Sequence, residues 1–156
     1  MQLEENTTLV SEGSNNIEIK TKAAKRSGLI NSFIIDFPEA EIPLEQISYP
    51  ILVKIKEYLE HYEDKEPNQI AQPLPKKDFK DCVDDWDYNF INLDNETIFE
   101  IMLAANFMDI QPLLDLTSAK IASEIKGKNE EQIRRLFHME KDDDDDNIEN
   151  LQIAED

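Results

Sequence analysis

The sequence is poor in the residues on which most catalytic and nucleotide-binding motifs depend. Its 156 residues include three glycines, two histidines and one cysteine. Glycines at positions 13, 28 and 127 alone can form neither a phosphate-binding loop nor a dinucleotide-binding fingerprint. His61 and His138 lie in helical patterns without a nucleophile motif beside them, and with Cys82 they are too few and too distant for a structural zinc site. We therefore expect a protein that is not an enzyme and that needs no cofactor or metal.

Signals for secretion and for membrane insertion are also missing. The single Cys82 cannot form an internal disulfide, and the first ten residues show no charged and then apolar pattern. The longest purely apolar run, residues 101–105, is far shorter than a membrane-spanning helix. We expect an intracellular protein that does not use membranes as partners.

Basic residues are scarce, and acidic residues dominate the charge. Sixteen Lys and Arg against 35 Asp and Glu give a net charge of −19, which repels nucleic acid. No register of the run at residues 142–146 combines the central glycine and the twelfth-position glutamate of a calcium loop, so we interpret it as a solvated acidic tail. An acidic chaperone or decoy that binds basic proteins is one function that this composition leaves open.

Turn residues, prolines and hydrophobic periodicity predict an α+β chain. A β-hairpin is predicted over residues 8–20, followed by a short helix near 22–26. A helix over 29–37, ended by Pro38, is predicted to carry its apolar residues at positions 29, 30, 33, 34 and 37 on one face, and an edge strand is predicted at 42–44. A helix opens at Ser48-Tyr49-Pro50, and its apolar residues at positions 51, 52, 55, 58 and 59 are expected to face a core. A mobile loop is predicted over the proline-containing residues 63–85. Further helices are predicted over residues 86–91, 95–108, 112–126 and 129–139, with Asn129 and Gln132 in a capping box.

Apolar residues in the last three predicted helices exceed what these helices can bury by themselves. The helix over 95–108 is apolar around most of its circumference, so we expect it to be covered on several sides. The next two helices carry narrower stripes, and a short helical tail can only partly bury them. An apolar groove that receives a partner helix is therefore predicted. The stripes consist of Leu113, Leu114, Leu116, Ile121 and Ile125, and of Ile133, Leu136 and Phe137.

Four ordered blocks in this half resemble the Skp1 family, namely residues 99–110, 113–115, 125–128 and 131–137. Upstream, residues 25–30, 42–44 and 51–62, and Trp86-Asp87 before Phe90, look like the same family. The resemblance thus covers most of residues 8–139. Elongin C is similar around residues 104–107 but stops near that point, whereas this chain continues through two more predicted helices. An Elongin C-like BTB adaptor is therefore the alternative.

The resemblance implies a BTB/POZ fold, in which a small N-terminal sheet is clustered with helices, plus a C-terminal helical extension that binds the F-box. On this basis we divide the chain into a tail at 1–7, a BTB/POZ domain at 8–110, an F-box-binding extension at 111–139 and an acidic tail at 140–156. The family is the non-catalytic adaptor of SCF-type cullin-RING E3 ubiquitin ligases, which bridges a cullin to F-box substrate receptors. This role implies a cytoplasmic and nuclear location.

Site residues follow from the same resemblance. Asn106 and Phe107 match the segment that faces the cullin, where the family usually has tyrosine at the position of Phe107. After Met139 the chain departs from the family pattern, and no tryptophan follows Trp86 to clasp the F-box. Pairing of two copies through the exposed stripe is a further alternative when no receptor is bound. The residues that match the F-box groove are Met102, Leu103, Leu114, Ile121, Ile125, Ile133, Leu136 and Phe137.

Overall fold

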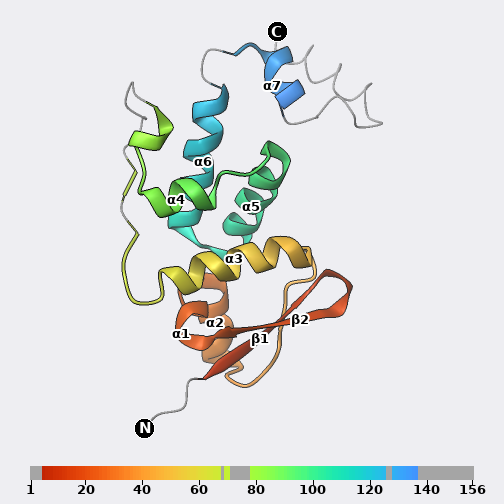
Figure 1. Ribbon diagram of the computed structural model, residues 1–156. Helices are drawn as coiled ribbons and strands as arrows, with labels where there is room; N and C mark the ends of the chain where they lie inside the picture. Colours follow the sequence, from red (N-terminus) through yellow and green to blue (C-terminus); the bar gives the residue numbers. More distant parts are fainter. Residues whose placement is uncertain (1–4, 68, 71–77, 126–127, 137–156) are drawn as a thin grey trace.

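The computed structural model of the chain describes residues 5–67, 69–70, 78–125 and 128–136. The predictions for Gly127, Phe137, His138 and the acidic run at 142–146 lie outside this description, as do the side chains of Ile133, Arg134 and Leu136. A small sheet lies at one end of the molecule, and α3 crosses between it and the helices α4 to α6 (Figure 1). The α+β prediction is confirmed by this arrangement.

The sheet has three strands in the order β2-β1-β3. β1 (Asn6–Ser11) and β2 (Asn15–Lys20) form the predicted antiparallel hairpin, and β3 (Ile42–Pro43) lies parallel to β1 at the edge. Pro43 is tolerated there because only one side of an edge strand has a neighbour. The short turn η1 (Glu12–Ser14) joins the hairpin strands, with Gly13 and Ser14 at positive φ angles of 78° and 61°.

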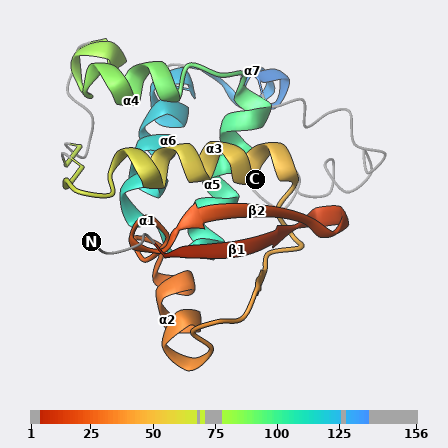
Figure 2. The ribbon, with the colours of Figure 1, turned by 60° about the horizontal axis from the view of Figure 1, so that its bottom comes forward.

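Two short helices follow the hairpin: the first lies beside the end of the strands, and the second extends below the sheet in Figure 2. They are α1 (Thr21–Ala24) and α2 (Gly28–Asp36). The helix predicted over 29–37 stops one residue early, since Phe37 has left helical geometry before Pro38. The prediction that Phe37 belongs to the apolar face of this helix is therefore wrong, because Phe37 lies outside the helix and is 56% exposed. Ile35, which is not part of that face, is 72% exposed.

Helix α3 (Tyr49–His61) confirms its predicted start and its predicted inner face. All five apolar residues expected to face the core, at positions 51, 52, 55, 58 and 59, are buried. The segment predicted to be a mobile loop contains the short turn η2 (Phe79–Asp81), and its mobility stays a prediction. Helix α4 (Asp85–Phe90) follows within one residue of the predicted start.

The last three helices lie close to their predicted bounds. They are α5 (Asn95–Met108), α6 (Gln111–Ile125) and α7 (Glu130–Leu136), and α5 and α6 pack side by side. The Asp94 side chain caps α5 by accepting from the Thr97 N–H at 3.1 Å. The capping box of α7 is confirmed, because the Asn129 N–H donates to Gln132 at 3.0 Å and the Gln132 N–H donates to Asn129 at 2.9 Å.

One apolar core joins the sheet to α3, α5 and α6. Among the described ranges, no helix combines the length and the apolar character needed to cross a membrane. The largest fully buried side chains of the core are Leu9, Ile19, Ile30, Ile42, Leu44, Leu52, Ile55, Leu59, Ile91, Ile98, Ile101 and Met108.

Candidate protein-binding surfaces

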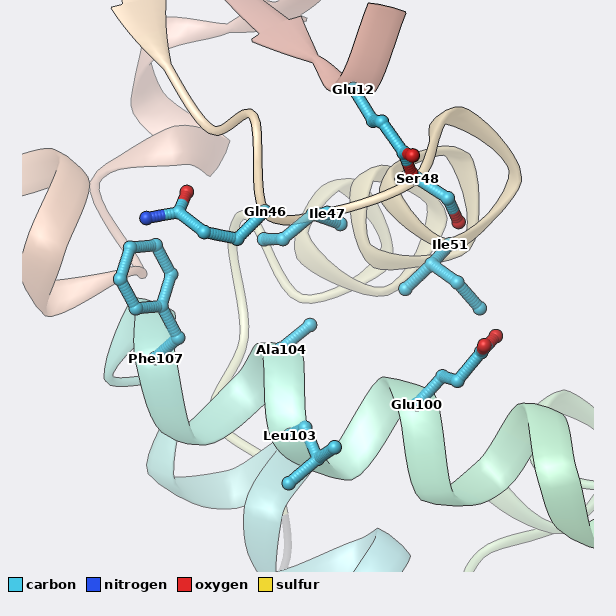
Figure 3. A pocket seen from close by; sticks show the side chains of 9 residues that line it. All are labelled: Glu12, Gln46, Ile47, Ser48, Ile51, Glu100, Leu103, Ala104 and Phe107. Carbon is cyan, nitrogen blue, oxygen red and sulfur yellow. The ribbon is translucent and has the colours of Figure 1, made fainter. Parts of the chain in front are cut away.

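A surface hollow of about 350 Å³ opens where α5, α3 and the hairpin turn meet (Figure 3). Three separate stretches of the chain form it: the turn at Glu12, the segment that leads into α3, and one face of α5. We refer to it as the α5 hollow. Its lining residues are Glu12, Gln46, Ile47, Ser48, Ile51, Glu100, Leu103, Ala104 and Phe107.

Helix α5 contributes four lining residues at positions 100, 103, 104 and 107, which share one helical face because they are spaced by three, four and seven residues. Ala104 is buried at the base, whereas Leu103 is 53% exposed and Phe107 is 42% exposed. The prediction that α5 is covered on several sides is confirmed for Ile98 and Ile101, which are fully buried. The face that carries Leu103 and Phe107 is open.

The wall opposite α5 is held in place by hydrogen bonds of the hairpin turn. The Glu12 N–H donates to the Ile47 carbonyl at 2.9 Å, which ties the turn to the segment before α3. The buried Ser11 hydroxyl donates to the Asn15 carbonyl at 3.1 Å and closes the turn itself. Ile47 and Ile51 are nearly fully buried, so this wall is apolar at its base.

The two ends of the α5 hollow differ in charge. Figure 3 shows the carboxylates of Glu12 and Glu100 at the end near Ser48, and Phe107 with Gln46 at the other end. Both glutamates are exposed, and neither forms an ion pair with another residue in the part of the chain that the structure describes. The hollow therefore offers an acidic end and an apolar end to whatever binds it.

The end of α5 is fixed by contacts with the start of α2. The buried Ser27 hydroxyl donates to the Met108 carbonyl at 2.6 Å and also accepts from the Ile30 N–H at 3.2 Å. These contacts give Ser27 and Ile30 a structural role, and both residues belong to the block of the resemblance at residues 25–30. They also hold the exposed Asn106 and Phe107, the predicted cullin-facing residues, at a defined place on the surface.

A second candidate surface lies on α6 and α7. Leu114, Ile121 and Ile125 are spaced by seven and four residues, share one face of α6, and are half-buried. Met102 on α5 is also half-buried. The predicted F-box residue Leu103 instead lines the α5 hollow together with Phe107. Ile133 and Leu136 lie on α7, and their roles stay predictions, as does that of Phe137.

Aromatic residues join α4 to the end of α3. The Tyr62 hydroxyl donates to the Asp87 carboxylate at 2.5 Å, and the His61 ring stacks on Trp86 with 3.6 Å between centroids. Burial raises the pKa of Asp87, and it lowers the pKa of His61. These contacts give the Trp86-Asp87 and Phe90 block a structural role, because Trp86 also stacks on Phe90.

Metal-binding chemistry finds no support among the described residues. No group of three or more His, Cys, Asp or Glu side chains there is arranged to hold a metal ion.

Sequence reasoning missed Glu12, Gln46 and Ser48 as surface-lining residues, because nothing near them in the sequence indicates that α5 will lie beside them. The apolar circumference of α5 predicted a helix covered on several sides, so it gave no signal for this open face.

Comparisons with known proteins agree with the resemblance seen in the sequence. Residues 5–64 match a family model described as Skp1 family, tetramerisation domain, which confirms the POZ fold, and residues 111–152 match one described as Skp1 family, dimerisation domain. The S-phase kinase-associated protein 1 homolog of Tetrahymena thermophila is 41% identical over 128 residues, which are 81% of this chain and 77% of that protein.

Two fungal proteins are similar over slightly more of the chain. The E3 ubiquitin ligase complex SCF subunit sconC of Talaromyces marneffei is 34% identical over 137 residues, or 86% of this chain and 85% of that protein. The protein of the same name from Emericella nidulans is 35% identical over 136 residues, or 86% of this chain and 84% of that protein. The chain belongs to the Skp1 family.

Proposed function

We propose that this chain is a non-catalytic adaptor of an SCF-type E3 ubiquitin ligase, which bridges a cullin to F-box substrate receptors in the cytoplasm and nucleus. The observation that carries the proposal is similarity over 86% of the chain to proteins named as SCF subunits. An adaptor acts by tethering, because it holds a substrate receptor at raised effective concentration near the ubiquitin-transfer machinery. Such a role needs binding surfaces and no catalytic residues.

The cullin side of the adaptor is assigned to the α5 hollow, with Phe107 at its end and the exposed Asn106 next to it in the sequence. A half-exposed phenylalanine beside a hollow with a buried apolar base is suited to an amphipathic partner helix. The wall opposite α5 is tied by the hydrogen bond from the Glu12 N–H to the Ile47 carbonyl, so we expect this surface to bind its partner without rearrangement.

The F-box side is assigned to α6 and α7, together with Met102 on α5, whereas Leu103 lines the α5 hollow. Its support is the half-buried stripe of Leu114, Ile121 and Ile125, which continues in sequence toward Ile133 and Leu136 on α7. A half-buried apolar stripe of this kind gains burial when a partner covers it. The two assigned surfaces use different residues, so one chain can hold both partners at once.

Affinity purification from the source cells tests the proposal. Full-length tagged chain is recovered at about 150 mM salt, where surface charges are screened within about 8 Å. We expect a cullin and several F-box proteins in the eluate. Recovery of neither contradicts the proposal.

A variant ending at residue 139 separates the adaptor from the acidic decoy, because it lacks the acidic tail. An adaptor keeps its F-box proteins when this tail is removed, whereas a decoy loses its basic partners.

A further inference from the structure

We propose that the α5 hollow selects a partner helix that carries a lysine or arginine about two turns away from an apolar anchor. The apolar anchor packs against Phe107, and the basic group is received by Glu12 and Glu100. This inference rests on the proposed function, because the helix is taken to belong to the cullin. It adds the chemistry that this partner must present.

The spacing of the two features comes from α5 itself. Glu100 and Phe107 are seven residues apart on one face of this helix, and at 1.5 Å per residue they are separated by about 10 Å along its axis. A partner helix that lies along α5 therefore meets both ends when its anchor and its basic residue are seven or eight residues apart. Figure 3 shows the carboxylates of Glu12 and Glu100 near Ser48, away from Phe107.

The apolar end supplies the contact area. Leu103 is 53% exposed and Phe107 is 42% exposed, and both flank the buried Ala104. An apolar side chain that enters here covers both residues and meets Ile47 at the base of the hollow. This part of the surface gives affinity but accepts many apolar residues equally well.

The acidic end supplies the selection. Two carboxylates on different elements, the hairpin turn and α5, line one end of the hollow. Among the described residues no cation is paired with either of them, so their charge is available to a partner. Because both are exposed, we expect them to act mainly on the association rate and on the choice of partner.

Charge also argues against two other occupants of the hollow. Residues 140–156 of this chain contain nine acidic residues and one lysine, so the chain's own tail is repelled by Glu12 and Glu100. A second copy brings a net charge of −19 to the same place. A partner whose helix carries basic residues is attracted by Glu12 and Glu100 instead of being repelled.

The test compares two double variants that lose the same charge. Glu12→Gln with Glu100→Gln keeps side-chain size at the acidic end, and Glu18→Gln with Glu39→Gln removes two exposed carboxylates that do not line the hollow. Binding of each full-length variant to the co-purified cullin is measured at about 50 mM and about 500 mM salt. We expect the first pair to bind about tenfold more weakly at low salt, mostly through slower association, and the difference to shrink at high salt.

F-box binding is measured in the same samples and should be unchanged for both pairs. Equal cullin binding by the two double variants overturns the inference, and loss of F-box binding by the first pair does so as well. Stronger binding after removal of residues 140–156, or a dimer that the first pair disrupts, would assign the hollow to the chain itself. If the unaltered chain binds no cullin, the proposed function fails and the inference fails with it. If Phe107→Lys removes the cullin while the glutamine pair has no effect, only the inference fails.

Discussion

Gly28 and Asp109 meet where α2 begins and α5 ends. The Gly28 N–H donates to the Asp109 carbonyl at 3.0 Å, and a Cβ atom at position 28 would overlap the Asp109 carboxylate. Asp109 closes α5 in the left-handed conformation, with φ at 56°. Glycine at 28 thus allows the approach that holds the end of α5, two residues beyond Phe107.

Gly28→Ala should destabilise the fold by about 1–3 kcal/mol, because the added methyl group forces α2 away from Asp109. Urea unfolding measures this loss. Asp109→Gly removes the obstructing carboxylate, and glycine readily adopts the positive φ. In the Asp109→Gly background, Gly28→Ala should therefore cost at least about 1 kcal/mol less. Equal costs in both backgrounds would mean that the Asp109 side chain is not the obstacle.

The buried pair of Tyr62 and Asp87 predicts a second stability effect. Tyr62→Phe removes the donor at 2.5 Å from a carboxylate that is only 5% exposed, so we expect a loss of about 1.5–3 kcal/mol at pH 7. The control is Tyr88→Phe, which removes the hydroxyl of a half-buried tyrosine that makes no side-chain hydrogen bond among the described residues. Chemical unfolding gives the free energy of unfolding of both variants. It should be almost unchanged in Tyr88→Phe and clearly lower in Tyr62→Phe.

The lowered pKa of His61 predicts how stability depends on pH. Burial, followed by the charge of Lys65, keeps the folded-state pKa below the unfolded value of 6.5. The folded chain therefore binds fewer protons than the unfolded chain near that pH, and this contribution to stability is lost as pH falls through 6.5 toward the folded pKa. His61→Phe retains an aromatic ring against Trp86 but cannot titrate.

We expect the free energy of unfolding of His61→Phe to change less than that of the unaltered chain between about pH 7.5 and pH 5. Unfolding curves in urea at several pH values give the two slopes. Asp87 acts in the opposite direction, because its raised pKa makes the folded chain bind more protons than the unfolded chain above pH 3.8. Parallel slopes for both chains would contradict the role assigned to His61.

The sequence predicted the elements that depend on local chemistry. The spacing of five apolar residues defined the inner face of α3, and the capping box at Asn129 marked the start of α7. The error at Phe37 has a local cause, since the chain leaves helical geometry one residue before Pro38. The α5 hollow could not be predicted, because Glu12, Gln46 and Glu100 come together only through the tertiary fold.

Asn106→Lys combined with Phe107→Lys should remove cullin binding and leave F-box binding unchanged. Both residues are exposed, so we expect the variant to fold, and two added charges at the apolar end of the α5 hollow oppose a basic partner helix. Pull-down with each partner gives the readout. Ile35→Lys with Phe37→Lys is the matched control, because it changes two exposed apolar residues near the end of α2 and should keep both partners. Loss of both partners in the first variant would show that Phe107 supports the core.

Leu136→Asp should weaken F-box binding by more than about 2 kcal/mol, or about thirtyfold, as expected for a buried anchor of an interface. Leu136 is the last residue of α7, and Arg135 beside it is exposed and pairs with Glu131 at 2.6 Å. Arg135→Asp therefore introduces the same carboxylate one position away, where it should cost less than about 1 kcal/mol of binding. Titration of an F-box protein into each variant gives the affinities, and thermal unfolding checks that neither change affects the BTB/POZ part. Equal affinities for the two variants would remove Leu136 from the F-box surface.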